Sequence, residues 1–205
     1  MSSIFYKYRA LDPWEYFLDV LVNERLHSAT FGALNDPMEG MFTYAKDQES
    51  PGFIRKIVEQ KTRLRICSLS RTYNSTVMWS YYAAAHHGVV LGVDIDLNHR
   101  DVMKVAKVTY AQKISFQGFA GSDAETEARK ILSKKLSAWR HEQEVRVFSH
   151  KKFVSVHLRQ VFLGCQMPST QQKLIKRLLH RMASDVEVKL MKRGDLDTQG
   201  LPDAI

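Results

Sequence analysis

The chain contains 205 residues, of which 44% are hydrophobic and 25% are charged, and this composition excludes a disordered or low-complexity chain. The length agrees with one domain, since domains commonly contain about 100–200 residues. A formal net charge of +8 permits contact with nucleic acid or with a phosphate-bearing ligand, but it requires neither. We therefore expect a single domain over residues 1–205, with roughly the last ten residues forming a mobile tail.

The two cysteines, Cys67 and Cys165, lie in apolar runs far apart in the sequence. This usage is typical of buried thiols in a reducing compartment, not of a disulfide framework. His86 and His87 alone provide too few ligands for zinc, so no metal is expected. No apolar signal core opens the chain, and no stretch approaches the about 18 apolar residues that a membrane span needs. The sequence therefore predicts a cytoplasmic protein without a membrane partner, and it leaves the oligomeric state open.

The first half of the chain contains both strand and helix signals. β-branched and aromatic residues predict a strand over residues 4–8. Asp12 predicts the N-cap of a helix, with Pro13 at the first helical position and Glu15 completing a capping box. The elements expected next are a strand over 25–29, an irregular loop over 32–40 that contains Asn35-Asp36-Pro37, a helix over 51–63, a strand over 64–69, a helix over 77–85 and a buried strand over 89–95.

The second half of the chain is richer in strands. Its expected elements are a strand over 102–110, a helix from Ser122 to about Trp139, strands over 145–150, 153–158 and 160–163, a basic helix to about Met182 and a strand over 186–191. Strands outnumber helices, and the regular alternation of a parallel α/β fold is missing. This pattern predicts an α+β domain with a bent, mixed or mostly antiparallel sheet flanked by helices.

Two predicted strands carry residues that suit an anionic or sugar ligand. Alternation places Lys7 and Arg9 on one face of the first strand, and the planar fork of arginine binds phosphate or carboxylate. The alternative is an edge strand whose charges oppose aggregation. Ser68 and Ser70 end a middle strand, where hydroxyl groups can bond a ribose or an amide. The alternative there is an ordinary strand entering a turn.

Two further segments combine aromatic or charged side chains. Trp79 and Tyr82, on a predicted helix, could stack on a planar ring, although aromatic residues at helical spacing also form cores. Glu142 and Glu144, at i and i+2 of a predicted strand, point to the same side, and Arg146 continues that face. Neighbouring carboxylates of this kind are tolerated where a ligand or an arginine uses them. The alternative is a Glu–Arg ladder on a solvated strand face.

The chain resembles an uncharacterised bacterial family, known as domain of unknown function 2971, through a string of motifs in the same order. The motifs cover residues 4 to 164 or so, and the family name implies no activity. They are YKYR at 6–9, NERLHSATFGALNDPMEG at 23–40, ICSLS at 66–70, MWSYYAAAHHGVVLGVDID at 78–96, KVTY at 107–110, WRHEQEVRVF at 139–148 and VFLG at 161–164.

The order Arg on the first strand, Ser-x-Ser on a middle strand and Glu-x-Glu on a late strand is similar to the ADP-ribosyltransferase superfamily. That superfamily binds NAD in a split, bent α+β sheet. The middle motif departs from the superfamily's usual Ser-Thr-Ser, because it reads Cys67-Ser68-Leu69-Ser70.

The resemblance implies that Arg9 contacts a phosphate or ribose of NAD and that Ser68 or Ser70 braces the nicotinamide-side ribose. It also implies that Glu144 holds the ribose 2′-hydroxyl and stabilises an oxocarbenium-like transition state, while Glu142 helps to activate the acceptor. A fixed carboxylate is suited to that role, because positive charge develops on the ribose as the bond to nicotinamide breaks. The expected NAD-binding residues are completed by Lys7, Tyr8, Trp79 and Tyr82.

Two functional hypotheses follow. The first is an NAD-dependent ADP-ribosyltransferase-like enzyme that modifies an unknown protein or nucleic-acid target, in toxin or phage-defence biology, with NAD as substrate and no metal. The second is a non-enzymatic nucleic-acid-binding module that uses the basic helix over Lys173–Arg181, which could equally be a solvated helix face. The pair Glu142 and Glu144 favours the first hypothesis, because a phosphate-binding face gains nothing from clustered carboxylates.

Overall fold

The computed structural model describes residues 4–44, 50–97, 99–116 and 123–197. The protein is α+β with a mixed sheet and flanking helices, as predicted. Its contacts group into two compact units, which are described one at a time. Unit 1 comprises Met1–Leu26, Leu69–Asp96 and Ser155–Ile205, and unit 2 comprises His27–Ser68 and Leu97–Val154. The single domain therefore stays a prediction, and most of the predicted mobile tail lies outside the described residues.

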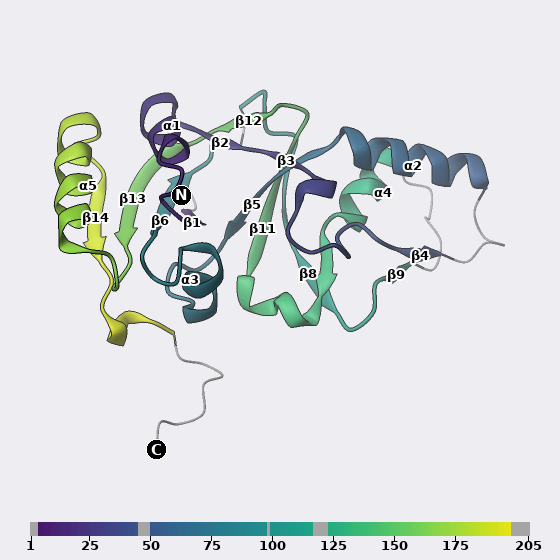
Figure 1. Ribbon diagram of the computed structural model, residues 1–205. Coiled ribbons are helices and arrows are strands. Elements are labelled where there is room, and N and C mark those ends of the chain that lie inside the picture. The colour runs from purple at the N-terminus through teal and green to yellow at the C-terminus, as the bar shows by residue number, and fades with distance from the viewer. Residues whose placement is uncertain (1–3, 45–49, 98, 117–122, 198–205) are drawn as a thin grey trace, which may run out of the picture. The chain divides into compact units, whose positions relative to one another are not determined.

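Unit 1 is built around a buried central strand, β6 (Val89–Asp94). This strand pairs antiparallel with β1 (Phe5–Arg9) on one side and with β13 (His157–Leu163) on the other. A parallel strand, β14 (Glu187–Leu190), follows β13. Figure 1 shows α5 alongside β14 and β13. The helices of the unit are α1 (Glu15–Asn23), α3 (Thr76–Tyr82) and α5 (Ser169–Met182).

A left-handed backbone segment follows α3 in unit 1. Ala84, Ala85 and His86 have φ angles of 47°, 48° and 68°, which is a conformation that side chains with a Cβ rarely adopt. The segment packs closely on Gly164, whose backbone N–H donates to the carbonyl of Gly88 at 3.0 Å. A Cβ added at Gly164 would lie 2.0 Å from the carbonyl oxygen of His86. The close approach of the two segments therefore requires glycine at this position.

Unit 2 contains paired strands, both antiparallel and parallel, and a helical layer. The helices α2 (Pro51–Arg63) and α4 (Ala124–Ile131) lie side by side (Figure 1) and share a core with Leu64, Ile66 and Phe148. The strand β5 (Arg65–Ser70) begins in unit 2 and its last two residues belong to unit 1, where Ser70 pairs with Tyr6. The other strands are β3 (Ala29–Thr30) beside β5, β11 (Glu144–Ser149) beside β7 (Lys104–Lys107), β10 (Lys134–Leu136) beside β8 (Thr109–Ala111), β4 (Thr43–Tyr44) beside β9 (Ser115–Phe116), and β2 (Arg25–His27) beside β12 (Phe153–Ser155).

Several predicted boundaries are wrong for identifiable reasons. The helix α1 begins at Glu15, and Trp14 occupies its N-cap position without a side-chain hydrogen bond, so Asp12 is not the cap. The strand predicted over 102–110 is divided into β7 and β8, which have different partners. The helix predicted to reach Trp139 ends at Ile131, because the next residues pair with β8 as β10 and then form the 3-10 helix η2 (Ser137–Glu142).

Candidate functional site

The predicted site residues divide between the two units. Unit 2 holds Ser68, Glu142 and Glu144, whereas unit 1 holds the other six predicted residues. Those unit 1 positions are Lys7, Tyr8, Arg9, Ser70, Trp79 and Tyr82. The unit 2 residues belong to a compact cluster of buried charges, and this cluster is the candidate functional site.

A paired arginine and glutamate form the centre of the cluster. Arg146 donates from Nε to Glu144 Oε1 at 2.8 Å and from Nη2 to Glu144 Oε2 at 2.9 Å. Both residues lie on β11, two positions apart, so strand alternation places them on one face as the sequence predicted. Arg146 is fully buried and Glu144 is 5% exposed. This is therefore not the solvated Glu–Arg ladder that was the alternative prediction.

Lys135 and Glu39 complete the cluster, and neither was among the residues predicted for it. Lys135 Nζ lies 2.6 Å from Glu142, 3.2 Å from Glu39 and 3.4 Å from Glu144. Glu39 also lies 2.7 Å from Arg146 Nη2. The cluster thus gathers three carboxylates and two cations, which leaves one negative formal charge on these five groups. The only sequence signal for Glu39 was its place near Asn35-Asp36-Pro37, and Lys135 gave none.

The position of Glu142 differs from the prediction. Glu142 ends η2 and is not on a strand, and Gln143 between the two glutamates has a φ angle of 44°. The two carboxylates therefore do not share a strand face through i, i+2 alternation. They meet instead through Lys135, which donates to both of them. The expected proximity is confirmed, although its predicted cause is wrong.

The cluster controls the charge state of its members. Burial by itself raises the pKa of Glu144, but the nearby charge and hydrogen bonds of Arg146, the charge of Lys135 and the neighbouring side chain of Ser68 outweigh it and lower that pKa to about 2. Burial lowers the pKa of Lys135, yet the charges of Glu144 and Glu142 dominate and raise it above its ordinary value. Glu144 is therefore ionised throughout the neutral range.

Two predicted residues of unit 1 belong to its core. Trp79 is fully buried and packs edge-to-face on Tyr8 at 5.7 Å, and its indole N–H donates to the carbonyl of Tyr73. The hydroxyl of Tyr8 donates to the carbonyl of Thr72 and accepts from the N–H of Ser75, so both groups already have structural partners. These contacts favour the core interpretation of the helix aromatics.

The remaining predicted residues of unit 1 are Arg9, Ser70, Lys7 and Tyr82. The guanidinium of Arg9 lies over the ring of Tyr16, 5.4 Å from its centroid. Ser70 is buried, and its hydroxyl accepts from the N–H of Thr72 at 3.1 Å. Lys7 and Tyr82 are half-buried. Their predicted contacts with NAD remain predictions.

Comparison of the chain with protein-family models, with curated proteins and with solved structures found no match in any of the three. The resemblances to domain of unknown function 2971 and to the ADP-ribosyltransferases therefore rest on the motifs alone. Among the described residues, no helix is long and apolar enough to cross a membrane. The same part of the chain has no group of three or more His, Cys, Asp or Glu residues placed to hold a metal ion.

Proposed function

We propose that the chain is an NAD-dependent, ADP-ribosyltransferase-like enzyme in which Glu144 stabilises the transition state and an unknown protein or nucleic acid is the acceptor. The observation that carries the proposal is that Ser68 and Glu144 are neighbours, since the serine side chain contributes to the lowered pKa of that carboxyl group. Two of the three motif positions, 76 residues apart in the sequence, thus lie together. Water is excluded from these charges, so they act strongly on one another, and the five groups together keep one negative formal charge.

The low pKa of Glu144 restricts its chemistry. A carboxyl group with a pKa of about 2 takes up no proton near neutral pH, so Glu144 acts as a fixed negative charge and not as a general base. The ribose C1′–nitrogen bond breaks with its electron pair leaving on nicotinamide, and the acceptor nucleophile then bonds to C1′ and releases a proton. Glu144 opposes the positive charge on the ribose in the first step. Glu142, held 2.6 Å from Lys135, is the proposed acceptor-side carboxylate.

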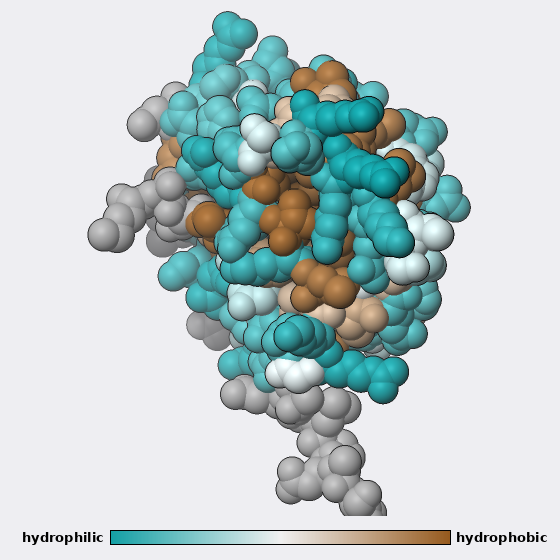
Figure 2. Space-filling view, turned by 90° about the vertical axis from the view of Figure 1, so that its left-hand side faces the viewer, coloured by the Kyte–Doolittle hydropathy of each residue, from teal (hydrophilic) through white to brown (hydrophobic). Residues whose placement is uncertain are grey.

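The competing hypothesis, a nucleic-acid module built on α5, has weaker support. The helix does expose Lys173, Lys176 and Arg177. Its exposed side also includes Leu174, with 56% of its surface accessible, and Met182. Figure 2 shows this side of the molecule, where brown apolar side chains are interspersed among teal hydrophilic ones. Interrupting apolar groups are poorly suited to a phosphate backbone, so α5 does not offer a continuous cationic track.

Nicotinamide release from NAD, measured with purified protein and cell lysate as the acceptor source, tests the proposal. We expect release by the wild type and its loss in Glu144→Gln, which keeps the shape of the side chain but removes its charge. Glu39→Gln is the matched control, because it also removes a carboxylate partner of Arg146 and Lys135 yet lies outside the Glu-x-Glu motif. Release by Glu39→Gln but not by Glu144→Gln would support the proposal. Absence of release by a folded wild type, or its retention in Glu144→Gln, would overturn it.

A further inference from the structure

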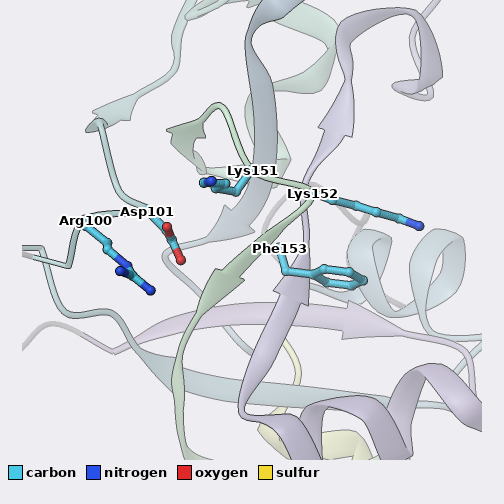
Figure 3. A pocket seen from close by; sticks show the side chains of 5 residues that line it. All are labelled: Arg100, Asp101, Lys151, Lys152 and Phe153. Carbon is cyan, nitrogen blue, oxygen red and sulfur yellow. The ribbon is translucent and has the colours of Figure 1, made fainter.

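An open groove lies in unit 2 at one end of the β7–β11 strand pair. The two strands are antiparallel and Lys104 opposes Phe148, so the loop before β7 and the turn after β11 leave from the same end. The N–H of Met103 donates to the carbonyl of Phe148 at 2.9 Å and extends the pairing to that loop. Between the loop and the turn lies a cavity of about 510 Å³. It is lined by Arg100, Asp101, Lys151, Lys152 and Phe153 (Figure 3).

The lining of the groove is cationic. Arg100, Lys151 and Lys152 are exposed, and Asp101 is the single carboxylate beside them. The carboxylate of Asp101 lies 3.6 Å from His99 Nδ1. Neither Arg100 nor Lys151 forms an ion pair with any residue of the described ranges, so their charges are available to a ligand. In Figure 3, Lys151 lies on the same side as Arg100 and Asp101, whereas Lys152 and Phe153 extend side by side in the other direction.

The backbone that carries these cations is firmly held. The N–H of Lys151 donates to Ser149 Oγ at 2.9 Å, and the carbonyl of Lys152 accepts from the N–H of Ser28 at 2.8 Å. The ring of Phe153 is half-buried and packs edge-to-face on His27, with 5.8 Å between the ring centroids. Lys152 Nζ lies 5.6 Å from the centroid of the same ring. The hydrogen bonds therefore fix the backbone of the turn, and the side chains of Lys151 and Lys152 extend from it, that of Lys152 beside the aromatic pair of Phe153 and His27.

We propose that this groove binds single-stranded nucleic acid, with Arg100 and Lys151 contacting successive phosphates and the aromatic pair of Phe153 and His27 receiving a base. The cations are spread along an open groove and do not converge on one point, which suits a chain of phosphates better than a single phosphate group. Aromatic side chains beside a cationic track are the usual means of holding unpaired bases without sequence preference. The inference does not depend on NAD chemistry, because no group of the groove belongs to the Glu144 cluster.

The test measures fluorescence anisotropy of a labelled single-stranded oligo-dT of about 12 nucleotides, a length within the usual range for such sites, at several salt concentrations. The triple variant Arg100→Ala, Lys151→Ala and Lys152→Ala removes three cations from the groove. We expect at least tenfold weaker binding at low salt. The slope of log affinity against log salt should fall by about 1.4, because Arg100 and Lys151 each lose a single-strand phosphate contact that contributes about 0.7.

A matched control removes the same charge from α5 through Lys173→Ala, Lys176→Ala and Arg177→Ala, and it should bind as the wild type does.

Phe153→Leu, which keeps an apolar side chain, should weaken binding roughly tenfold by loss of stacking. Thermal unfolding checks that each variant is folded. The proposal is overturned if the wild type does not bind, if the groove variant binds normally, or if the α5 variant loses binding instead. Tighter binding of a duplex of equal length, or displacement by inorganic triphosphate at equal phosphate concentration, would also overturn it.

Discussion

Arg146 donates one hydrogen bond to each carboxylate oxygen of Glu144, and both side chains are buried. A bidentate contact of this kind is stronger and more directional than a single ion pair. It also makes the two residues depend on each other, because a buried charge that loses its partner keeps its full desolvation cost.

Arg146→Met should therefore destabilise the protein strongly. The substitution leaves Glu144 and Glu39 buried with Lys135 as their remaining cation among these five groups. We expect a loss of about 3–5 kcal/mol in the free energy of unfolding, measured in urea. Lys189→Met removes a cation from the exposed pair with Glu187 on β14 and should leave the unfolding curve unchanged. Equal urea midpoints for the two variants would contradict the importance of the cluster.

The ionisation of Glu144 predicts a pH dependence of stability. Its pKa is lowered from 4.5 to about 2 in the folded state, so its contribution is complete above the unfolded value and is lost as the pH falls from about 4.5 toward 2. The shift corresponds to about 3 kcal/mol, since one pKa unit is worth about 1.4 kcal/mol. Urea unfolding of the wild type and of Glu144→Gln between pH 7 and pH 3 isolates this group. Their difference in stability should shrink with acidity, and a constant difference would contradict the assignment.

The close contact between Gly164 and His86 predicts that alanine destabilises the protein at Gly164 but not at Gly194. Gly164→Ala would place a methyl group against the carbonyl of His86, and the backbone must move to accommodate it. Overpacking of this kind typically costs about 1–3 kcal/mol. Gly194→Ala is the control, because a Cβ there meets no atom within 4 Å. A lower melting temperature is expected for the first variant alone.

Helix caps provide a local test of unit 1. The hydroxyl of Ser75 accepts from the N–H of Met78 and caps α3, so Ser75→Ala should cost about 1 kcal/mol. Ser169 begins α5 but makes no capping hydrogen bond, and Ser169→Ala should be neutral. Chemical denaturation of both variants distinguishes the cases. A loss at Ser169 as large as that at Ser75 would show that the assigned caps are wrong.

The sequence predicted those features that depend on neighbouring residues. The largely apolar stretch over 89–95 becomes the central strand β6, and the helix predicted over 51–63 is α2 with the same bounds. Alternation along β11 placed Glu144 and Arg146 on one face. Each of these predictions uses a spacing of a few residues, where backbone geometry alone decides which side chains meet.

Features that depend on distant segments escaped prediction. The residues Lys134–Leu136 favour a helix locally, but they become a strand because β8 is available as a partner. Arg146 and Glu39 are 107 positions apart, and no periodicity joins them. The left-handed segment from Ala84 to His86 also gave no signal, because its alanines resemble the end of an ordinary helix.

The buried cluster also constrains how this protein can diverge. Its five groups come from three separate stretches of the chain, and each one contacts at least one group of opposite charge. A neutral replacement of Lys135 removes the cation that Glu142 contacts, and a neutral replacement at any of the other positions changes the charge balance of the cluster, whereas paired replacements can restore that balance. Descendants of this sequence should therefore vary at these five positions in concert or not at all. Correlated substitution of Glu39 and Arg146 across natural variants would be evidence for that constraint.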